Sequence, residues 1–333
     1  MNGRARRGLL RLEGAWWMMR VSVWMAIMVP AGSFAAADTP SPVELLAAVF
    51  ATVLAGGLAV VMNDILDRKK DEVTAPELPL PSGVVTLAQA LAFAAALTIC
   101  TIGLWAVAST TLLGWVLALV ISGFGGLLVV LYSFAKPFGL VGPLVGGLAY
   151  TTIPVAAWAA AGRGEGSYPI EIVGIYALLI GTGGIIHAAI RDVDTDGEVG
   201  NLTVAVRLGP RGALSLGTAF YLASTVCVAW AGIVDSRTAA GIALSVATIL
   251  TILYAHLTAH RRMSGSAAGR ATRVNAMRPV TLSRLACHLA MIAIASPLLA
   301  AAVGAVSLVV IPLQIVGYRA RIYRGGLKEA LES

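Results

Sequence analysis

The stretch VVMNDILDRKKDEV, residues 60–73, joins the end of a long apolar run to a dense group of charged side chains. Asn63, Asp67 and Asp71 follow one another at intervals of four residues, with basic residues between them. On a helix, residues four apart share one face, so three oxygen-bearing side chains are aligned here. Only 12% of the 333 residues are charged. This concentration therefore predicts a specific role for the end of the apolar run.

The chain around this stretch is 58% hydrophobic, with a mean hydropathy of +0.84. Soluble proteins contain about 45–50% apolar residues, and here the apolar residues form blocks of about 20, enough for a helix to cross a hydrocarbon core of about 30 Å. The blocks lack the polar–apolar alternation of barrel strands. The sequence therefore predicts an all-α integral membrane protein, with residues 1–333 forming a single polytopic domain.

The polar breaks between blocks predict a bundle of nine or ten transmembrane helices. Residues 1–38 resemble a signal peptide, but the apolar stretch is long and Arg20 interrupts it, so we expect an uncleaved first helix. Residues 282–318 are too long for one crossing; Pro297 and Gly304 predict a turn between a ninth and a tenth helix, and a ninth helix with an interfacial tail is the alternative. The other expected helices are 16–37, 43–63, 84–106, 112–132, 140–161, 169–190, 213–233 and 238–258.

The distribution of Lys and Arg predicts the orientation. With the N-terminus inside, the inner loops hold sixteen basic residues and the outer loops two. Basic residues stay on the cytoplasmic side, which explains the net charge of +7 without a nucleic-acid partner, and no nucleic-acid-binding motif is present. The longest loops are also on the inner side, so we expect a cytoplasmic active-site cap. These loops are 63–83, 191–212 and 259–280.

A second acidic cluster lies in RDVDTDGEVGNLTVAVRLG, residues 191–209, where Asp192 and Asp196 are again four apart. Carboxylates at this spacing repel one another unless a cation lies between them. Mg²⁺ binds oxygen ligands, typically one or two carboxylates together with water and phosphate oxygens. One such cluster alone is often a solvated helix end. Two clusters with matching spacing on one side of the membrane favour magnesium ions that bridge a diphosphate.

These residues carry a resemblance to a known family. NDILDRKKD (63–71) resembles the N-D-x-x-D-x-x-x-D signature of the UbiA superfamily of intramembrane prenyltransferases, and RDVDTD (191–196) resembles its second motif, D-x-x-x-D. YSFAK (132–136), PLPSG (79–83) and GNLTVAVRLG (200–209) are also similar to family segments. One departure is Leu78, where the family usually has Arg before PLPSG.

The resemblance implies the chemistry. A polyprenyl diphosphate would place its head between the acidic clusters and its tail in an apolar groove open to lipid. Departure of diphosphate would leave an allylic carbocation, which a lipophilic acceptor attacks. The resemblance implies Mg²⁺ ligands at Asn63, Asp67, Asp192 and Asp196, with Asp64 and Asp71 as further ligands or their supports. It implies diphosphate contacts from Arg68, Lys136 and Arg191, and Asp67, Asp192, Lys136 and Tyr132 as the catalytic group.

Several alternatives remain open at this stage. His187 is either a base facing the site or a packing residue, and Trp105, Trp115 and Trp158 are expected to be interfacial anchors. The acceptor is not specified by the sequence. A terpene cyclase would use the same ionisation without an acceptor. An ion-coupled transporter is less favoured because the acids lie at helix ends and not in mid-membrane.

Overall fold

A computed structural model of the chain describes residues 3–19, 28–35, 41–162, 168–263 and 269–318. All regular elements in these ranges are helical. In chain order the helices are α1 (Gly3–Met18), α3 (Met28–Ala35), α4 (Pro42–Leu66), α5 (Arg68–Thr74), α6 (Leu87–Ala108), α7 (Leu112–Ala135), α8 (Val141–Ala161), α9 (Ile170–Ala189), α10 (Val193–Glu198), α11 (Val204–Val234), α12 (Thr238–Arg262), α13 (Arg270–Ala276), α14 (Arg278–Ala295) and α15 (Pro297–Tyr318).

Hydroxyl side chains start several of the long helices. Ser41 accepts a hydrogen bond from the Val43 amide, and Pro42 follows it at a position where the missing amide hydrogen costs nothing. Thr86 forms a reciprocal capping box with Gln89 at the start of α6. Thr111 and Thr203 cap α7 and α11 by accepting hydrogen bonds from the backbone amides of Gly114 and Val206. These caps fix where each apolar block becomes helical.

Seven of the described helices are long and apolar enough to cross a membrane, namely α4, α6, α7, α8, α9, α11 and α12. They match seven predicted helices within a few residues, except that α11 begins earlier, at Val204, and bends at Gly209 and Pro210. The chain is therefore an integral membrane protein. The predicted total of nine or ten crossings is not confirmed by this count.

The two ends of the chain differ from the prediction. α1 ends at Met18, inside the helix expected over 16–37, and α3 begins at Met28; residues 20–27, with Arg20, lie outside the described residues. At the other end, α14 and α15 are separated at Ser296, directly before Pro297, as the proline predicted. Gly304 lies inside α15 and does not mark a turn.

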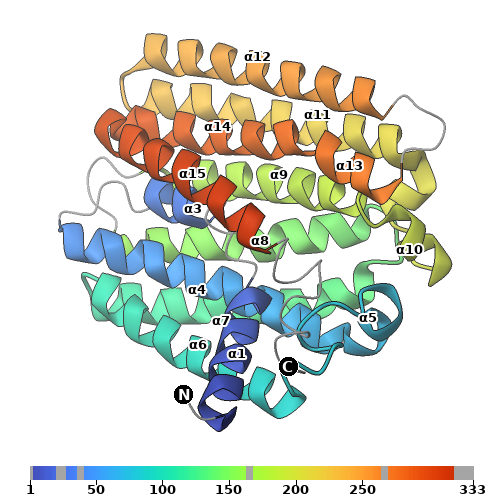
Figure 1. Ribbon diagram of the computed structural model, residues 1–333. Helices are drawn as coiled ribbons and strands as arrows, with labels where there is room; N and C mark the ends of the chain where they lie inside the picture. The colour runs from blue at the N-terminus through green and yellow to red at the C-terminus, as the bar shows by residue number, and fades with distance from the viewer. Residues whose placement is uncertain (1–2, 20–27, 36–40, 163–167, 264–268, 319–333) are drawn as a thin grey trace.

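The long helices run side by side, and the short helices α5, α10 and α13 lie together at one end of the bundle (Figure 1). The loops 63–83, 191–212 and 259–280 contain these short helices, so the three longest loops meet at a single end, as expected. We call this the polar end. α1 also lies beside it, packed on α4 and α6.

The bundle has two sides that are packed differently. α4, α6 and α7 form one side, which we call the cavity side, because a partly open cavity of about 530 Å³ lies between these helices, against α8. α8, α9, α11 and α14 form the other, which we call the packed side, and its helices contribute most of the main buried core. α6 packs chiefly on α4, and α7 on α8, whereas α6 and α7 contact each other only sparsely.

Trp105 corrects one expectation from the sequence. Its side chain is completely buried, and its indole Nε1 donates a hydrogen bond to Ser122 Oγ at 3.1 Å. It is therefore an internal residue between α6 and α7 and not an interfacial anchor. Trp158 is also buried, donating to the Tyr168 carbonyl, while Trp115 remains partly exposed.

Candidate active site at the polar end

The first acidic cluster is held together by a lysine from another helix. Asp67 is the C-cap residue of α4 and Lys136 that of α7, so both residues lie where an apolar helix gives way to a loop. The Lys136 ammonium forms an ion pair with Asp67 and donates to Asn63 Oδ1 at 2.9 Å. Asn63 Nδ2 donates to Asp67 Oδ2 at 3.2 Å. The Lys136 ammonium therefore contacts the oxygen atoms of Asn63 and Asp67, two residues predicted to bind the metal.

Tyr132 lies one helical turn before Lys136 and packs beside the first acidic cluster. The Lys136 ammonium is 5.0 Å from the centre of the Tyr132 ring. Gly146 lets this ring approach α8 closely, because a β-carbon there would lie 3.0 Å from Tyr132 Cδ2. The tyrosine therefore lies beside the Lys136–Asp67 ion pair.

The second cluster is joined to the first by Lys70. The Lys70 ammonium donates to Asp196 Oδ1 at 3.1 Å, linking α5 to α10 across 126 residues of sequence. Asp196 is buried, and Asn201 also approaches it, with Nδ2 at 3.4 Å from Oδ1. The Asn201 amide donates to the Asp196 carbonyl at 2.8 Å and closes the loop after α10. The Lys70–Asp196 ion pair therefore ties the segment of the first acidic motif to the second motif.

Backbone contacts fasten the surrounding loops. The Gly139 amide donates to the Leu202 carbonyl at 3.2 Å, and Gly139 and Thr203 form an isolated parallel bridge. Gly139 adopts a φ of 62°, which favours glycine, and the Arg207 side chain lies against it. These contacts tie the YSFAK segment to the GNLT segment. They fix Lys136 relative to the second acidic cluster.

Two predicted diphosphate contacts have other partners. Arg68 forms an ion pair with Glu72 at 3.3 Å, and both side chains are more than 40% exposed. Arg191 Nε donates to the Ala188 carbonyl at 3.3 Å and caps the end of α9. Neither guanidinium is among the groups that bind the carboxylates Asp67 and Asp196. Lys136 is the predicted basic residue that the structure brings to the site.

The remaining predicted residues occupy distinct positions. Asp192 lies at the N-terminal end of α10, and Asp71 is on α5. Asp64 is buried within α4. His187 is buried with Nε2 3.3 Å from the Leu214 carbonyl and its ring edge-on to Tyr221, so it serves in helix packing.

Leu78 occupies the position before PLPSG where the family usually has Arg, and it has a packing role. Its side chain is buried in a small apolar cluster with Met18, Met19 and Val61. The PLPSG segment that follows turns back on itself, since the Val85 amide donates to the Pro79 carbonyl at 2.9 Å. Leu78 therefore anchors this loop to α1 and α4 by apolar packing.

Sequence reasoning missed Lys70 and Asn201 as site residues. Lys70 lies three residues after Asp67, close to the same helical face, which was a usable signal. Its partner Asp196 lies 126 residues away, and spacing rules do not reach that far. Arg273 was also missed; it pairs with Asp194 and ties α13 to α10.

The oxygen donors fit a metal that is completed by its substrate. Within the described part of the chain, no three acidic, histidine or cysteine side chains are grouped closely enough to surround one ion. Mg²⁺ does not need such a cage, because it is commonly held by one or two carboxylates plus phosphate oxygens and water. Asn63 with Asp67, and Asp192 with Asp196, provide donor sets of this kind. Both sets consist of hard oxygen ligands.

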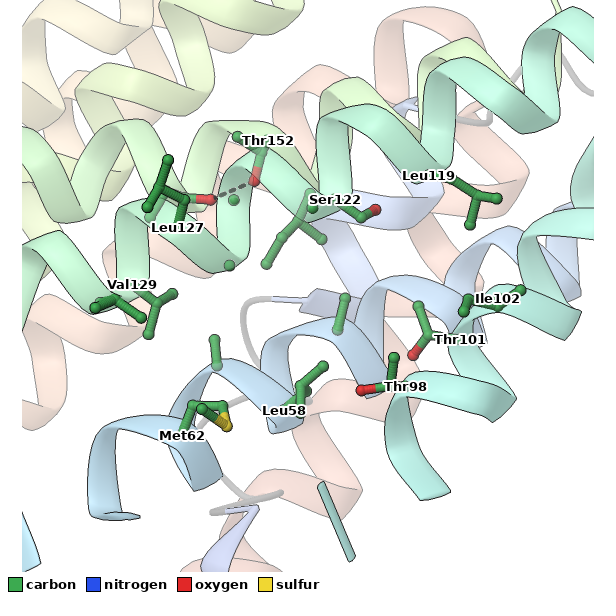
Figure 2. A pocket seen from close by; sticks show the side chains of 18 of the residues that line it. Leu58, Met62, Thr98, Thr101, Ile102, Leu119, Ser122, Leu127, Val129 and Thr152 are labelled. Carbon is green, nitrogen blue, oxygen red and sulfur yellow. Dashed lines mark hydrogen bonds between the residues drawn. The ribbon is translucent and has the colours of Figure 1, made fainter. Parts of the chain in front are cut away.

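The apolar cavity begins beside the first cluster. Met62, next to Asn63, lines one end of it, and Figure 2 shows lining side chains such as Leu58, Thr101 and Ser122 that come from different helices. The hydroxyls of Thr98, Thr101 and Thr152 donate to carbonyls of their own helices. Their hydrogen-bonding capacity is therefore used, and the cavity wall is almost wholly apolar.

The family of this chain follows from comparison with known proteins. The model of the UbiA prenyltransferase family matches residues 22–277. The chain therefore belongs to the UbiA prenyltransferase family, a class of membrane enzymes that transfer prenyl groups.

Relatives of known name agree with this assignment. The chain is 30% identical over 196 residues to a digeranylgeranylglyceryl phosphate synthase of Natronomonas pharaonis, covering 59% of this chain and 68% of that protein. It is 29% identical over 162 residues to a protoheme IX farnesyltransferase of Shewanella loihica, covering 47% of this chain and 53% of that protein.

Solved structures share the fold. A UbiA homolog from Aeropyrum pernix superposes with a TM-score of 0.62 at 19% identity, covering 82% of this chain and 96% of that one. A UbiA homolog from Archaeoglobus fulgidus, solved with GPP and Mg²⁺, gives 0.61 at 15% identity, covering 84% and 99%. The all-helical architecture is therefore of the UbiA type.

Proposed function

We propose that this prenyltransferase ionises a polyprenyl diphosphate in a magnesium-dependent step at the polar end and transfers the prenyl group to a lipophilic acceptor. One observation carries the proposal. The Lys136–Asp67 and Lys70–Asp196 ion pairs join both acidic motifs beside the end of an apolar cavity at Met62. A charged head and an apolar tail are the two parts of such a substrate.

Asn63, Asp67, Asp192 and Asp196 would hold the magnesium ions, with Asp64 and Asp71 as further ligands or supports. When bound, the metal supplies positive charge that stabilises the departing diphosphate. The Archaeoglobus fulgidus homolog binds GPP and Mg²⁺ together, which supports the same pairing here. This arrangement also relieves the mutual repulsion of the carboxylates.

Lys136 is the residue of this chain that would hold the diphosphate oxygens. Its ammonium lies among Asp67, Asn63 and the ring of Tyr132. Lys136 has three donors, so it has capacity for a substrate oxygen as well. The allylic carbon–oxygen bond breaks, and its electron pair leaves with the diphosphate.

The Tyr132 ring would then face the allylic cation. An aromatic face stabilises a nearby cation electrostatically, as it does the Lys136 ammonium in this structure. The acceptor forms the new bond to the cation and gives up a proton. The prenyl tail lies meanwhile in the cavity between α4, α6 and α7, where water is excluded.

The polar end would face the cytoplasm. This orientation rests on the sixteen basic residues in the loops on that side against two on the other. It also places the short helices α5, α10 and α13 as a cytoplasmic cap over the diphosphate site. A water-soluble leaving group would then be released into the cytoplasm.

The test is release of pyrophosphate by the purified protein in lipid nanodiscs. Geranyl, farnesyl and geranylgeranyl diphosphate would be supplied with and without Mg²⁺, and with phenolic or glycerol phosphate acceptors, followed by mass analysis of the products. We expect magnesium-dependent release and a prenylated acceptor. A cyclic product formed without an acceptor would instead show a terpene cyclase. If none of the three prenyl diphosphates released pyrophosphate, both the transferase and the cyclase would be excluded.

A further inference from the structure

The cavity is lined by residues of four helices. On α4 and α6 the lining residues recur at intervals of three and four, so each of these helices presents a single face to the cavity; they are Ala55, Leu58, Ala59 and Met62, and Thr98, Thr101, Ile102 and Trp105. α7 contributes a wider surface between Leu119 and Val130, and Ala149, Thr152 and Ile153 of α8 complete the wall. α4 runs toward the polar end and α6 runs away from it, so Met62 marks the near end and Trp105 the far end.

Trp105 and Ser122 close the far end. The Trp105 indole is fully buried, and its hydrogen bond to Ser122 Oγ spans from α6 to α7, which otherwise contact each other sparsely. An indole nitrogen inside a membrane needs such a partner, and the bond fixes the ring orientation. The ring is therefore a rigid floor to the space that begins at Met62.

The depth of this space corresponds to a definite length of prenyl chain. Ser122 lies fourteen residues before Lys136 along α7, which is about 21 Å at the helical rise per residue. One isoprene unit adds four carbon–carbon bonds to the chain and is about 5 Å long when extended. About four isoprene units therefore fit between the Lys136 level and the floor.

Two exposed glycines of α7 leave the wall of the cavity open. A β-carbon on Gly123 or Gly126 would have no atom within 4 Å, although both residues line the cavity. Gly125 between them is different, because a β-carbon there would overlap the Thr152 side chain. Glycine lowers helix stability by about 1 kcal/mol relative to alanine. Close helix packing explains Gly125 but explains neither Gly123 nor Gly126.

We infer that the Trp105–Ser122 pair is the floor of the prenyl-tail cavity and limits the bound chain to about four isoprene units. This inference rests on the proposed function, because it assumes that the tail enters the cavity from the polar end. Trp105 acts as a specificity-determining residue. Gly123 and Gly126 keep the path to it open.

Binding measurements in Mg²⁺ test the floor without knowledge of the acceptor. Calorimetric dissociation constants would be measured in nanodiscs for inorganic pyrophosphate and for geranyl, farnesyl, geranylgeranyl and hexaprenyl diphosphate. For the native chain we expect affinity to rise up to geranylgeranyl and to fall for hexaprenyl. Trp105→Ala should raise hexaprenyl affinity at least tenfold and leave pyrophosphate affinity unchanged.

Filling the cavity should shorten the preferred chain stepwise. Gly126→Leu should weaken farnesyl and geranylgeranyl binding at least tenfold and spare geranyl, whereas the deeper Gly123→Leu should weaken geranylgeranyl alone. Gly103→Leu is the matched control, since Gly103 on α6 also has open space but does not line the cavity. These variants also keep the test valid if Trp105→Ala does not fold.

The outcomes separate the two proposals. If neither pyrophosphate nor any prenyl diphosphate binds the native protein in Mg²⁺, the proposed function is wrong. The ligands can instead bind with the same dependence of affinity on chain length in Gly123→Leu and Gly126→Leu as in Gly103→Leu. The assignment of Trp105 and Ser122 as the floor is then wrong, and the proposed function stands.

Discussion

α7 and α8 are consecutive helices that pack on each other, yet they belong to two sides of the bundle with opposite properties. In the most apolar stretch of α8, 72% of the residues are buried, against 22% in α7. The cavity side leaves space between helices and lines it with apolar atoms. The helices of the packed side contain buried polar and charged groups, among them Arg284 and His288.

The packed side shows what polar groups inside a membrane require. The Arg284 guanidinium lies 4.8 Å from the centre of the Tyr150 ring, and Gly184 lets it approach α9 closely. His288 contacts the hydroxyls of Tyr176 at 2.9 Å and Tyr150 at 3.4 Å. Such groups are stable only among close partners. The comparison teaches that buried charge is held on the packed side by aromatic and histidine partners, and that the proposed site lies where the two sides meet.

The strongest test of this junction removes one carboxylate from each side. Asp67 comes from the cavity side and Asp192 from the packed side, and we expect Asp67→Asn and Asp192→Asn each to lower turnover roughly a hundredfold to a thousandfold. Magnesium-dependent pyrophosphate release measures the effect. The thermal unfolding midpoint should change little, because both residues lie outside the apolar packing. Near-normal turnover in either variant would show that its cluster is dispensable.

A pair of alanine substitutions tests the difference in packing directly. A β-carbon on Gly147 would overlap the Thr182 side chain and lie 2.8 Å from its backbone nitrogen, so Gly147→Ala must separate α8 from α9. We expect a loss of about 1–3 kcal/mol in unfolding free energy. Gly126→Ala on the cavity side is the matched control, and it should be neutral or slightly stabilising. Equal losses in a denaturant titration would contradict the distinction between the two sides.

A smaller effect is expected from the bond that joins the two clusters. Lys70→Met removes the ion pair with Asp196, and we expect turnover to fall about tenfold, as for loss of one partly buried charged hydrogen bond. The exposed neighbour Lys69→Met is the control and should stay within about twofold. A Lys70→Met enzyme as active as the control would mean that the clusters do not need this link.

The smallest effect concerns Arg68, which the sequence assigned to the diphosphate. Because it pairs with Glu72 on the exposed face of α5, Arg68→Met should change turnover by less than about twofold. Steady-state kinetics with geranylgeranyl diphosphate would measure this. A tenfold rise in KM would instead return Arg68 to the substrate site.

Most of the fold was predictable because lipid imposes one rule along the whole chain. Blocks of about 20 apolar residues must be helical to satisfy their backbone groups, and this rule located the seven long helices. Over the expected helix 16–37 the outcome is incomplete, because α1 ends at Met18 and α3 begins at Met28, with residues 20–27 outside the described ranges. Hydropathy alone does not separate an apolar helix that crosses from one that packs beside the polar end.

The candidate site was predictable in its carboxylates but not in its cations. Acidic residues four apart signal a shared face, so Asp67, Asp192 and Asp196 were found from local spacing. Lys70 and Arg273 act through partners on distant segments, and only the tertiary structure brings those together. Trp105 was misassigned because the sequence does not distinguish a tryptophan at an interface from one that fills the space between two helices.

The buried cluster of α14 has a consequence for how the protein is made. An arginine inside a crossing helix costs about 2.5–3.5 kcal/mol on insertion into the bilayer. α14 is not among the seven helices that are long and apolar enough to cross a membrane, and it carries both Arg284 and His288. Their partners Tyr150 and Tyr176 lie on α8 and α9, which are synthesised earlier. We therefore expect α14 to leave the translocon only as it docks on these helices, so that the last part of the chain is inserted by assembly with the earlier part.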